Sequence, residues 1–191
     1  VPFCTIQSTA LIFGLDPDDV EPLDNRRPTD QRQGPSMSNR YFTATTQKQQ
    51  PVFEKDLNVA INQALLYRLA SGDSNSIHID PGSIPPLIDS PEDENGTKRP
   101  ILHGLATLGM ATRLIEQFIR HKLGPTCKFC LTHVEAQFTK PVFVGDALRI
   151  RIWNHETRND MLLFQVFKTE SEQVTIDQGT ATFAEIDRSK L

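Results

Sequence analysis

The segment 71–81 carries the residue types and the spacing that acid–base chemistry needs. Asp73 and His78 lie five residues apart in it, while Gly72 and Asn75 favour turns over a regular helix. A carboxyl group and an imidazole held on one loop can converge on a single water molecule. An acid–base pair of this kind is the minimum set of groups that can add water to an activated double bond, or remove water to form one.

The same residues also allow a purely structural interpretation. Asp73 and Asn75 are common turn formers, because their side chains hydrogen-bond nearby backbone, and His78 fits a hydrogen-bonded residue of the core. If the loop is catalytic, Asn75 lies between the acid and the imidazole, where it can orient the water. The loop alone leaves both interpretations open.

The elements around this loop must position it. Residues 58–69 show apolar side chains in a roughly helical pattern, and Gly72 suits the end of that helix, which would deliver Asp73 to its place. Four strand-like segments follow later, at about 127–139, 147–156, 161–170 and 174–186.

The longest helical pattern covers residues 101–123 and stops at Gly124. A long helix followed by a run of antiparallel strands predicts an α+β domain whose sheet packs on the helix. The apolar positions that recur at three- and four-residue steps are Leu105, Leu108, Ala111, Leu114, Ile115, Phe118 and Ile119.

Three separated blocks of the chain carry a resemblance to the MaoC-like hydratases. The resemblance is strongest to the (R)-specific 2-enoyl-CoA hydratase 2 region of peroxisomal multifunctional enzymes. It covers roughly residues 51–186 and, less firmly, residues 1–15. One departure is Ser76, which stands where this family usually has Pro. The blocks are Tyr67–Pro81, Pro100–Thr107 and Phe138–Asp146.

The resemblance implies a hot-dog fold, a long helix wrapped by an antiparallel sheet, here as the second half of a double hot-dog. It also implies a hydro-lyase that converts trans-2-enoyl-CoA reversibly to (3R)-3-hydroxyacyl-CoA. Asp73 and His78 would serve as the acid and the base, in an order that the sequence leaves open, with Asn75 beside them.

The start of the long helix is the expected site of charge stabilisation. Pro100 suits a helix beginning, and the unpaired N–H groups of a first turn attract negative charge. In the family the glycine matching Gly104 offers its amide to the thioester oxygen, although tight packing of the helix on the sheet would also explain a glycine. His103 is expected to line the same pocket, in its neutral form, or to be structural.

CoA is polyanionic, so some basic side chains must meet it. Lys140 is our candidate substrate-binding residue among four conceivable cations, although an ordinary solvated surface charge is the alternative for each. The other three are Lys98, Arg99 and Arg113.

The resemblance divides the chain into four parts. Residues 1–14 are expected to be the last strand of a preceding hot-dog half and residues 15–50 a linker, followed by the hydratase domain at 51–188. Ser189, Lys190 and Leu191 form the tripeptide read by the peroxisomal import receptor. We therefore expect a peroxisomal enzyme of fatty-acid β-oxidation that works with a second hot-dog half or as a homodimer. The polar loop at 82–99 is expected to be a surface insertion or a lid.

Composition excludes several other classes. The 191 residues can build one good core and hardly two, and the net charge of −4 comes without a basic patch interleaved with aromatic residues. Nucleic acid is therefore not an expected partner, and no apolar run approaches a membrane span. No cofactor is expected, because the chain has no glycine-rich nucleotide loop.

No metal is expected either. Cys127 and Cys130 have the spacing of zinc ligands, but a second pair is missing and His133 is the only nearby third ligand. With Cys4 the cysteine count is odd, so disulfides are not expected.

Two rival functions remain open: a MaoC-like dehydratase that acts on acyl-carrier-protein substrates, and a non-catalytic hot-dog module that only binds acyl-CoA.

Overall fold

A computed structural model describes residue 42, residues 46–124 and residues 126–186. The predicted strand at 1–14 and the tripeptide 189–191 lie outside these residues, as does most of the predicted linker. The described elements are β1 (Phe53–Asn58), α2 (Gln63–Ser71), the 3₁₀ turns η2 (Ser76–His78) and η3 (Pro81–Ser83), α3 (Gly104–Leu123), β2 (Phe129–Phe138), β3 (Ala147–Asn154), β4 (Met161–Lys168) and β5 (Val174–Glu185).

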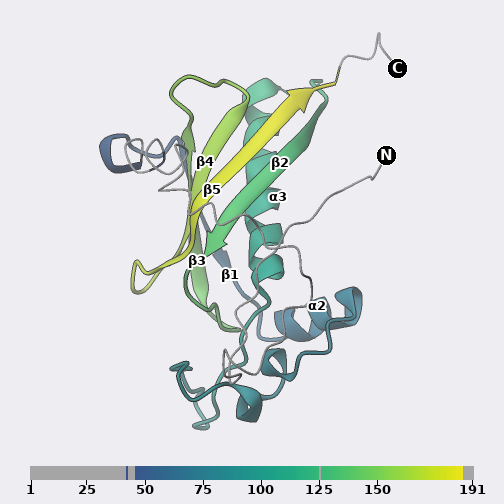
Figure 1. Ribbon diagram of the computed structural model, residues 1–191, viewed down its shortest axis with the longest axis vertical. Coiled ribbons are helices and arrows are strands. Elements are labelled where there is room, and N and C mark those ends of the chain that lie inside the picture. Colours follow the sequence, from purple (N-terminus) through teal and green to yellow (C-terminus); the bar gives the residue numbers. More distant parts are fainter. Residues whose placement is uncertain (1–41, 43–45, 125, 187–191) are drawn as a thin grey trace, which may run out of the picture. The chain divides into compact units, whose positions relative to one another are not determined.

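The five strands form one sheet in the order β1-β3-β4-β5-β2, and every neighbouring pair is antiparallel. Helix α3 runs along one face of this sheet (Figure 1). The α+β hot-dog fold that the sequence predicted is therefore confirmed, and the four later strands lie within two residues of their predicted bounds at each end. No helix in the described part of the chain combines the length and apolar character needed to cross a membrane.

Helix α3 buries a stripe of small and branched side chains against the sheet. Its buried positions recur at one- and four-residue steps, which places them on one side of the helix. The prediction that Leu105 belongs to this stripe is wrong: its side chain is 54% exposed. The buried positions are Ala106, Thr107, Ala111, Ile115 and Ile119.

The predicted starts of both helices are wrong, because the residues before them pair with residues far along the chain. Asn58 pairs with Ala147 in the sheet, so α2 begins only at Gln63. The N–H of Leu102 donates to the carbonyl oxygen of Val142 at 2.7 Å, so α3 begins at Gly104.

The outer face of the sheet carries a smaller apolar cluster. Phe42, which is 3% exposed, packs there with Trp153 and Leu163. The indole N–H of Trp153 donates to the carbonyl oxygen of Gln49 at 3.0 Å. The described end of the predicted linker is thus packed on the domain.

A buried carboxylate fastens the segment before α3 to the sheet. Asp146, whose side chain is 6% exposed, lies 2.9 Å from the Arg99 guanidinium and 3.0 Å from the Lys168 ammonium. It also accepts a hydrogen bond from the Phe143 N–H at 3.0 Å. Two cations and a backbone donor compensate the charge that burial would otherwise make unfavourable.

We expect Asp146→Ala to lower the free energy of unfolding by about 3 kcal/mol, because two cations and one N–H lose their common partner. Urea unfolding followed by circular dichroism measures the change. Asp160→Ala is the matched control, because Asp160 pairs with Arg158 at an exposed site and should move the unfolding midpoint little. Equal effects of the two substitutions would contradict the anchoring role of Asp146.

Candidate active site

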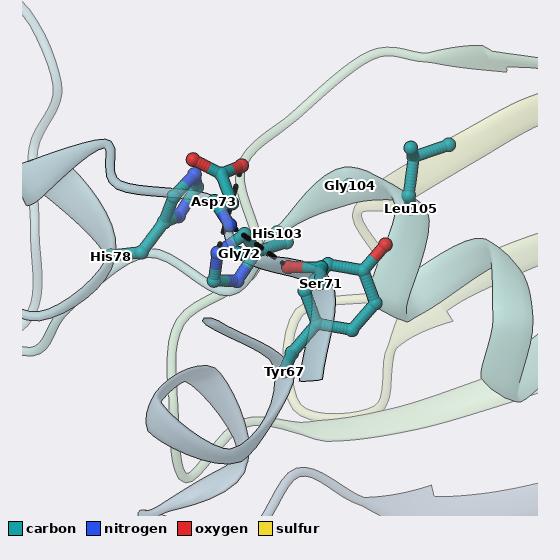
Figure 2. Close-up of a pocket in the computed structure, with 8 residues that line it drawn as sticks. All are labelled: Tyr67, Ser71, Gly72, Asp73, His78, His103, Gly104 and Leu105. Carbon is teal, nitrogen blue, oxygen red and sulfur yellow. Dashed lines mark hydrogen bonds and ion pairs between the residues drawn. The ribbon is translucent and has the colours of Figure 1, made fainter. Parts of the chain in front are cut away.

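A pocket of about 370 Å³ opens where α2, the turn after it and the start of α3 meet (Figure 2). Three of the residues predicted for catalysis, and one predicted to bind substrate, line it together. The eight lining residues are Tyr67, Ser71, Gly72, Asp73, His78, His103, Gly104 and Leu105.

The end of α2 places Asp73 at the pocket. Gly72 ends the helix in the left-handed conformation (φ 75°), which glycine adopts without strain. The Oδ1 atom of Asp73 then accepts a hydrogen bond from the Asn75 N–H at 2.9 Å. Its Oδ2 atom is left for other contacts, on a side chain that is 42% exposed.

The turn η2 places His78. The side chain is buried, and its Nδ1 atom lies 2.7 Å from the carbonyl oxygen of Ile101. Because a carbonyl can only accept, this contact requires a proton on Nδ1. The Nε2 atom therefore holds the lone pair, or a second proton when the ring is charged.

His103 is the third titratable group of the pocket, and its ring is 3% exposed. It stacks on His78 with ring centroids 3.6 Å apart and lies 4.6 Å from the ring of Tyr67. Its Nε2 atom lies 3.8 Å from Oδ2 of Asp73 (Figure 2). Burial lowers the pKa of His103, with a further contribution from His78, so the neutral ring that the sequence predicted is favoured.

Gly104 is the first residue of α3. Among the hydrogen bonds of the described residues, neither its N–H nor that of Leu105 has an acceptor. These donors and the positive end of a helix of 20 residues face the pocket. A Cβ at this position would lie 3.2 Å from the Phe138 ring, so close packing also favours a glycine here.

Asn75 and Lys140 lie outside the lining of the pocket. The Oδ1 atom of Asn75 accepts a hydrogen bond from the Ile77 N–H at 3.3 Å and so caps η2. Lys140 is exposed, two residues beyond Phe138. The catalytic role of Asn75 and the binding role of Lys140 therefore stay predictions.

The partner of Arg99 and the effect of Ser76 could not be assigned from local sequence. Arg99, one of the conceivable cations for CoA, is engaged with Asp146 instead. Ser76 donates no backbone hydrogen bond among the described residues, so the proline usual in the family would fit here without loss of a bond. Replacing that proline by Ser76 leaves the hydrogen bonds of the turn intact.

Sequence reasoning also missed Tyr67 and Ser71 as residues that line the pocket. The signal was present: Tyr67 and Ser71 are four residues apart on α2 and so share one face of the helix. Arg68 donates to the backbone carbonyl of Asn75 at 3.3 Å and ties the loop that follows α2 back to the helix.

Asp73, His78 and His103 also have the donor atoms of a metal site, and these lie within 4.8 Å of one another. Lone pairs of imidazole nitrogens lie in the ring plane, and the two rings are stacked with 21° between their planes. The lone pairs therefore run side by side instead of meeting at one ion. This geometry favours acid–base chemistry over metal binding.

Comparison with known proteins decides the family. Residues 42–178 match the MaoC like domain. The chain belongs to the MaoC-like family. This match begins at Phe42, the residue that packs on the outer face of the sheet.

Proteins similar to this MaoC-like chain include one from a bacterium and one from a yeast. The chain is 35% identical over 67% of its length to 3-hydroxyacyl-thioester dehydratase Y of Mycobacterium tuberculosis, and 32% identical over 74% to the peroxisomal hydratase-dehydrogenase-epimerase of Saccharomyces cerevisiae. The matched parts make up 41% and 13% of those proteins. This MaoC-like chain thus spans less than half the length of these relatives.

Two solved structures agree with the fold of this MaoC-like chain. A MaoC-like dehydratase from Phytophthora capsici is 32% identical, with a TM-score of 0.56, over 73% of this chain and 44% of that one. The full-length peroxisomal multifunctional enzyme type 2 of Drosophila melanogaster is 31% identical, with a TM-score of 0.55, over 72% of this chain and 23% of that one.

The lowered pKa of His103 predicts a specific dependence of stability on pH. The unfolded chain takes up a proton near the ordinary histidine pKa of about 6.5. Burial lowers the pKa of folded His103, His78 and Arg68 lower it further, and the Asp73 carboxylate only partly opposes them. The free energy of unfolding should therefore fall as the pH drops below about 6.5. His103→Phe should flatten this fall between about pH 7 and about pH 5.5.

Urea unfolding at several pH values measures the slope. The pKa values of three carboxyl groups, Asp56, Asp80 and Asp160, are lowered by their hydrogen bonds. Their stabilising contribution is lost as the pH falls through the ordinary carboxyl range near 3.8, outside this window. His121→Phe, which removes an exposed imidazole from the same helix, is the matched control. Equal slopes for the wild type and His103→Phe would contradict the prediction.

Proposed function

We propose that this chain is the second hot-dog unit of an (R)-specific 2-enoyl-CoA hydratase. The reaction is the reversible hydration of trans-2-enoyl-CoA to (3R)-3-hydroxyacyl-CoA. One observation carries the proposal: the carboxyl group of Asp73, the imidazole of His78 and the unpaired N–H of Gly104 meet in one pocket. Hydration of an enoyl thioester needs a base, an acid and a stabilised oxygen anion.

Each group has one part of the reaction. Asp73 and His78 hold a water between them, and one of them takes its proton while the oxygen bonds to C3. The other group gives a proton to C2, so the double bond becomes single and the elements of water have been added. Negative charge develops on the thioester oxygen during the reaction. The Gly104 N–H and the positive end of α3 stabilise that charge.

A related reaction is the second candidate. The Mycobacterium tuberculosis relative is named a 3-hydroxyacyl-thioester dehydratase, and dehydration is the reverse of the same chemistry. A chain that prefers carrier-protein thioesters to CoA thioesters would be such a dehydratase. Comparison of the two kinds of thioester as substrates decides between them.

We further infer a peroxisomal location and a part in fatty-acid β-oxidation. The support is the ending Ser189-Lys190-Leu191, an address for the import receptor, together with relatives named as peroxisomal enzymes in yeast and mouse. A fluorescent fusion that keeps this ending free tests the location. Deletion of the three residues should leave the fusion in the cytosol.

We also propose that the unit works with a second hot-dog unit, from a longer chain or from a second copy. β2 is an edge strand of the sheet, so one side of its backbone is open to pairing within the described part of the chain. Helix α2 and the residues before it also expose large apolar side chains, more than a solvated helix usually carries. These are Ile61, Leu65, Leu66 and Leu69.

Activity on a medium-chain trans-2-enoyl-CoA tests the reaction, followed by loss of the conjugated-enoyl absorbance and by the chirality of the product. Asp73→Asn and His78→Gln should each lower kcat on the order of a hundredfold or more, because each removes an acid–base group. The matched controls are Asp80→Asn, whose side chain caps η3 away from the pocket, and His121→Gln.

A (3S) product would contradict the assignment. Unchanged turnover in Asp73→Asn, with acyl-CoA binding retained, would instead identify a module that only binds acyl-CoA. Loss of activity in the controls as well would show that the substitutions act through folding.

Sedimentation tests the partner. The chain should form a dimer, or a one-to-one complex with an added hot-dog unit, and Leu69→Asp should weaken that association by placing a charge on the apolar face of α2. Leu87→Asp is the control, because Leu87 is exposed in the 82–99 loop. A monomer with full activity on long acyl chains would contradict the proposal.

A further inference from the structure

The ring of His103 is the most unusual buried group of the described residues. Both of its nitrogens are buried, and neither has a hydrogen-bond partner. A buried polar atom without a partner is unfavourable by about 1–3 kcal/mol, so such a side chain calls for an explanation. His103 is also the residue before α3, yet its side chain makes no capping hydrogen bond to the helix, which removes the ordinary structural reason for a polar residue there.

The stacking of His103 on His78 supplies one explanation. His78 is anchored at a single atom, by the 2.7 Å contact of Nδ1 with the Ile101 carbonyl. One such bond fixes the tautomer but holds the ring plane only loosely, because a hydrogen bond to a carbonyl tolerates a broad range of angles. A flat ring at 3.6 Å, with 21° between the planes, removes that freedom and so directs Nε2 of His78.

The contact of His103 with Asp73 supplies a second explanation for the buried imidazole. Oδ1 of Asp73 is already held by the Asn75 N–H, while Oδ2 faces Nε2 of His103 at 3.8 Å. This distance is too long for a hydrogen bond. Catalytic contacts are often long before substrate binds and shorten in the complex, and a shift of about 1 Å would give Nε2–H a carboxylate acceptor.

We propose that His103 is a positioning residue that aligns both members of the acid–base pair, His78 through its ring face and Asp73 through its Nε2–H. This role rests on the proposed hydration reaction. It differs from binding the substrate, because His103 acts on the two reacting side chains. Tyr67 packs against the ring of His103, with centroids 4.6 Å apart, and supports it in turn.

Three substitutions separate the two contacts. His103→Phe keeps a flat ring on His78 but has no N–H for Asp73. His103→Gln keeps an amide N–H but loses the ring, and His103→Ala loses both. His121→Ala, on the exposed side of α3, is the matched control.

The first measurement is steady-state kinetics. His103→Ala should lower kcat on the order of a hundredfold, as expected for misaligned reacting groups, while KM changes by less than about threefold because no substrate contact is removed. His103→Phe and His103→Gln should each retain more activity than His103→Ala. A rise in KM with unchanged kcat would overturn the proposal, since His103 would then bind substrate.

The second measurement needs no turnover: long-range ¹H–¹⁵N NMR of the His78 ring. The proton of His78 should stay on Nδ1 in every variant, because the Ile101 carbonyl holds it there. The wild type and His103→Phe should show sharp ring signals for His78, whereas the ring signals in His103→Ala should broaden by exchange between ring orientations. Equally sharp His78 signals in His103→Ala would overturn the proposal, even if kcat or the melting temperature falls, because His103 would then act only through packing.

The two measurements also separate the two hypotheses. A wild-type chain that hydrates no enoyl-CoA, alone or with a second hot-dog unit, refutes the proposed function. The NMR measurement then still decides whether His103 orders His78.

Discussion

The short contact between His78 Nδ1 and the Ile101 carbonyl is the interaction on which the site depends. It joins the loop after α2, which carries Asp73 and His78, to the segment that leads into α3, which carries His103 and Gly104. A second hydrogen bond, from the Ile101 N–H to the Ile77 carbonyl oxygen at 3.3 Å, joins the same two segments. Together the two bonds hold both segments around one pocket, with the proton of His78 on Nδ1.

The segment that contains Ile101 is also bonded to the connection between β2 and β3. Arg99, just before the Ile101 segment, is bound to the buried carboxylate of Asp146, and the Leu102 N–H is bound to Val142. Both partners lie between β2 and β3, so this connection supports the segment from one side while the loop after α2 meets it from the other. The polar groups of the pocket thus rest on a segment that is bonded to the β2–β3 connection.

Much of the fold could be read from the sequence, because the signals for strands and turns are local. β3, β4 and β5 alternate or run apolar between clear turn residues, and their predicted bounds were close. The helix starts were misplaced because pairing with distant residues decided them: Asn58 with Ala147, and Leu102 with Val142. The same holds for the site. The spacing of Asp73 and His78 suggested chemistry, but the stacking of His103 and the use of the Ile101 carbonyl depend on contacts more than twenty residues apart.

The cluster of Phe42, Trp153 and Leu163 has a practical consequence for anyone who excises the domain. A shortened protein that starts at residue 51 would lack Phe42, which packs against Trp153. It would also lack the carbonyl oxygen of Gln49 that accepts from the Trp153 indole N–H. The bared surface lies on the outer face of the sheet, away from α3, where nothing else in the described chain replaces it. Poor expression or aggregation of such a shortened form would reflect this lost contact, and would say nothing about the residues of the pocket.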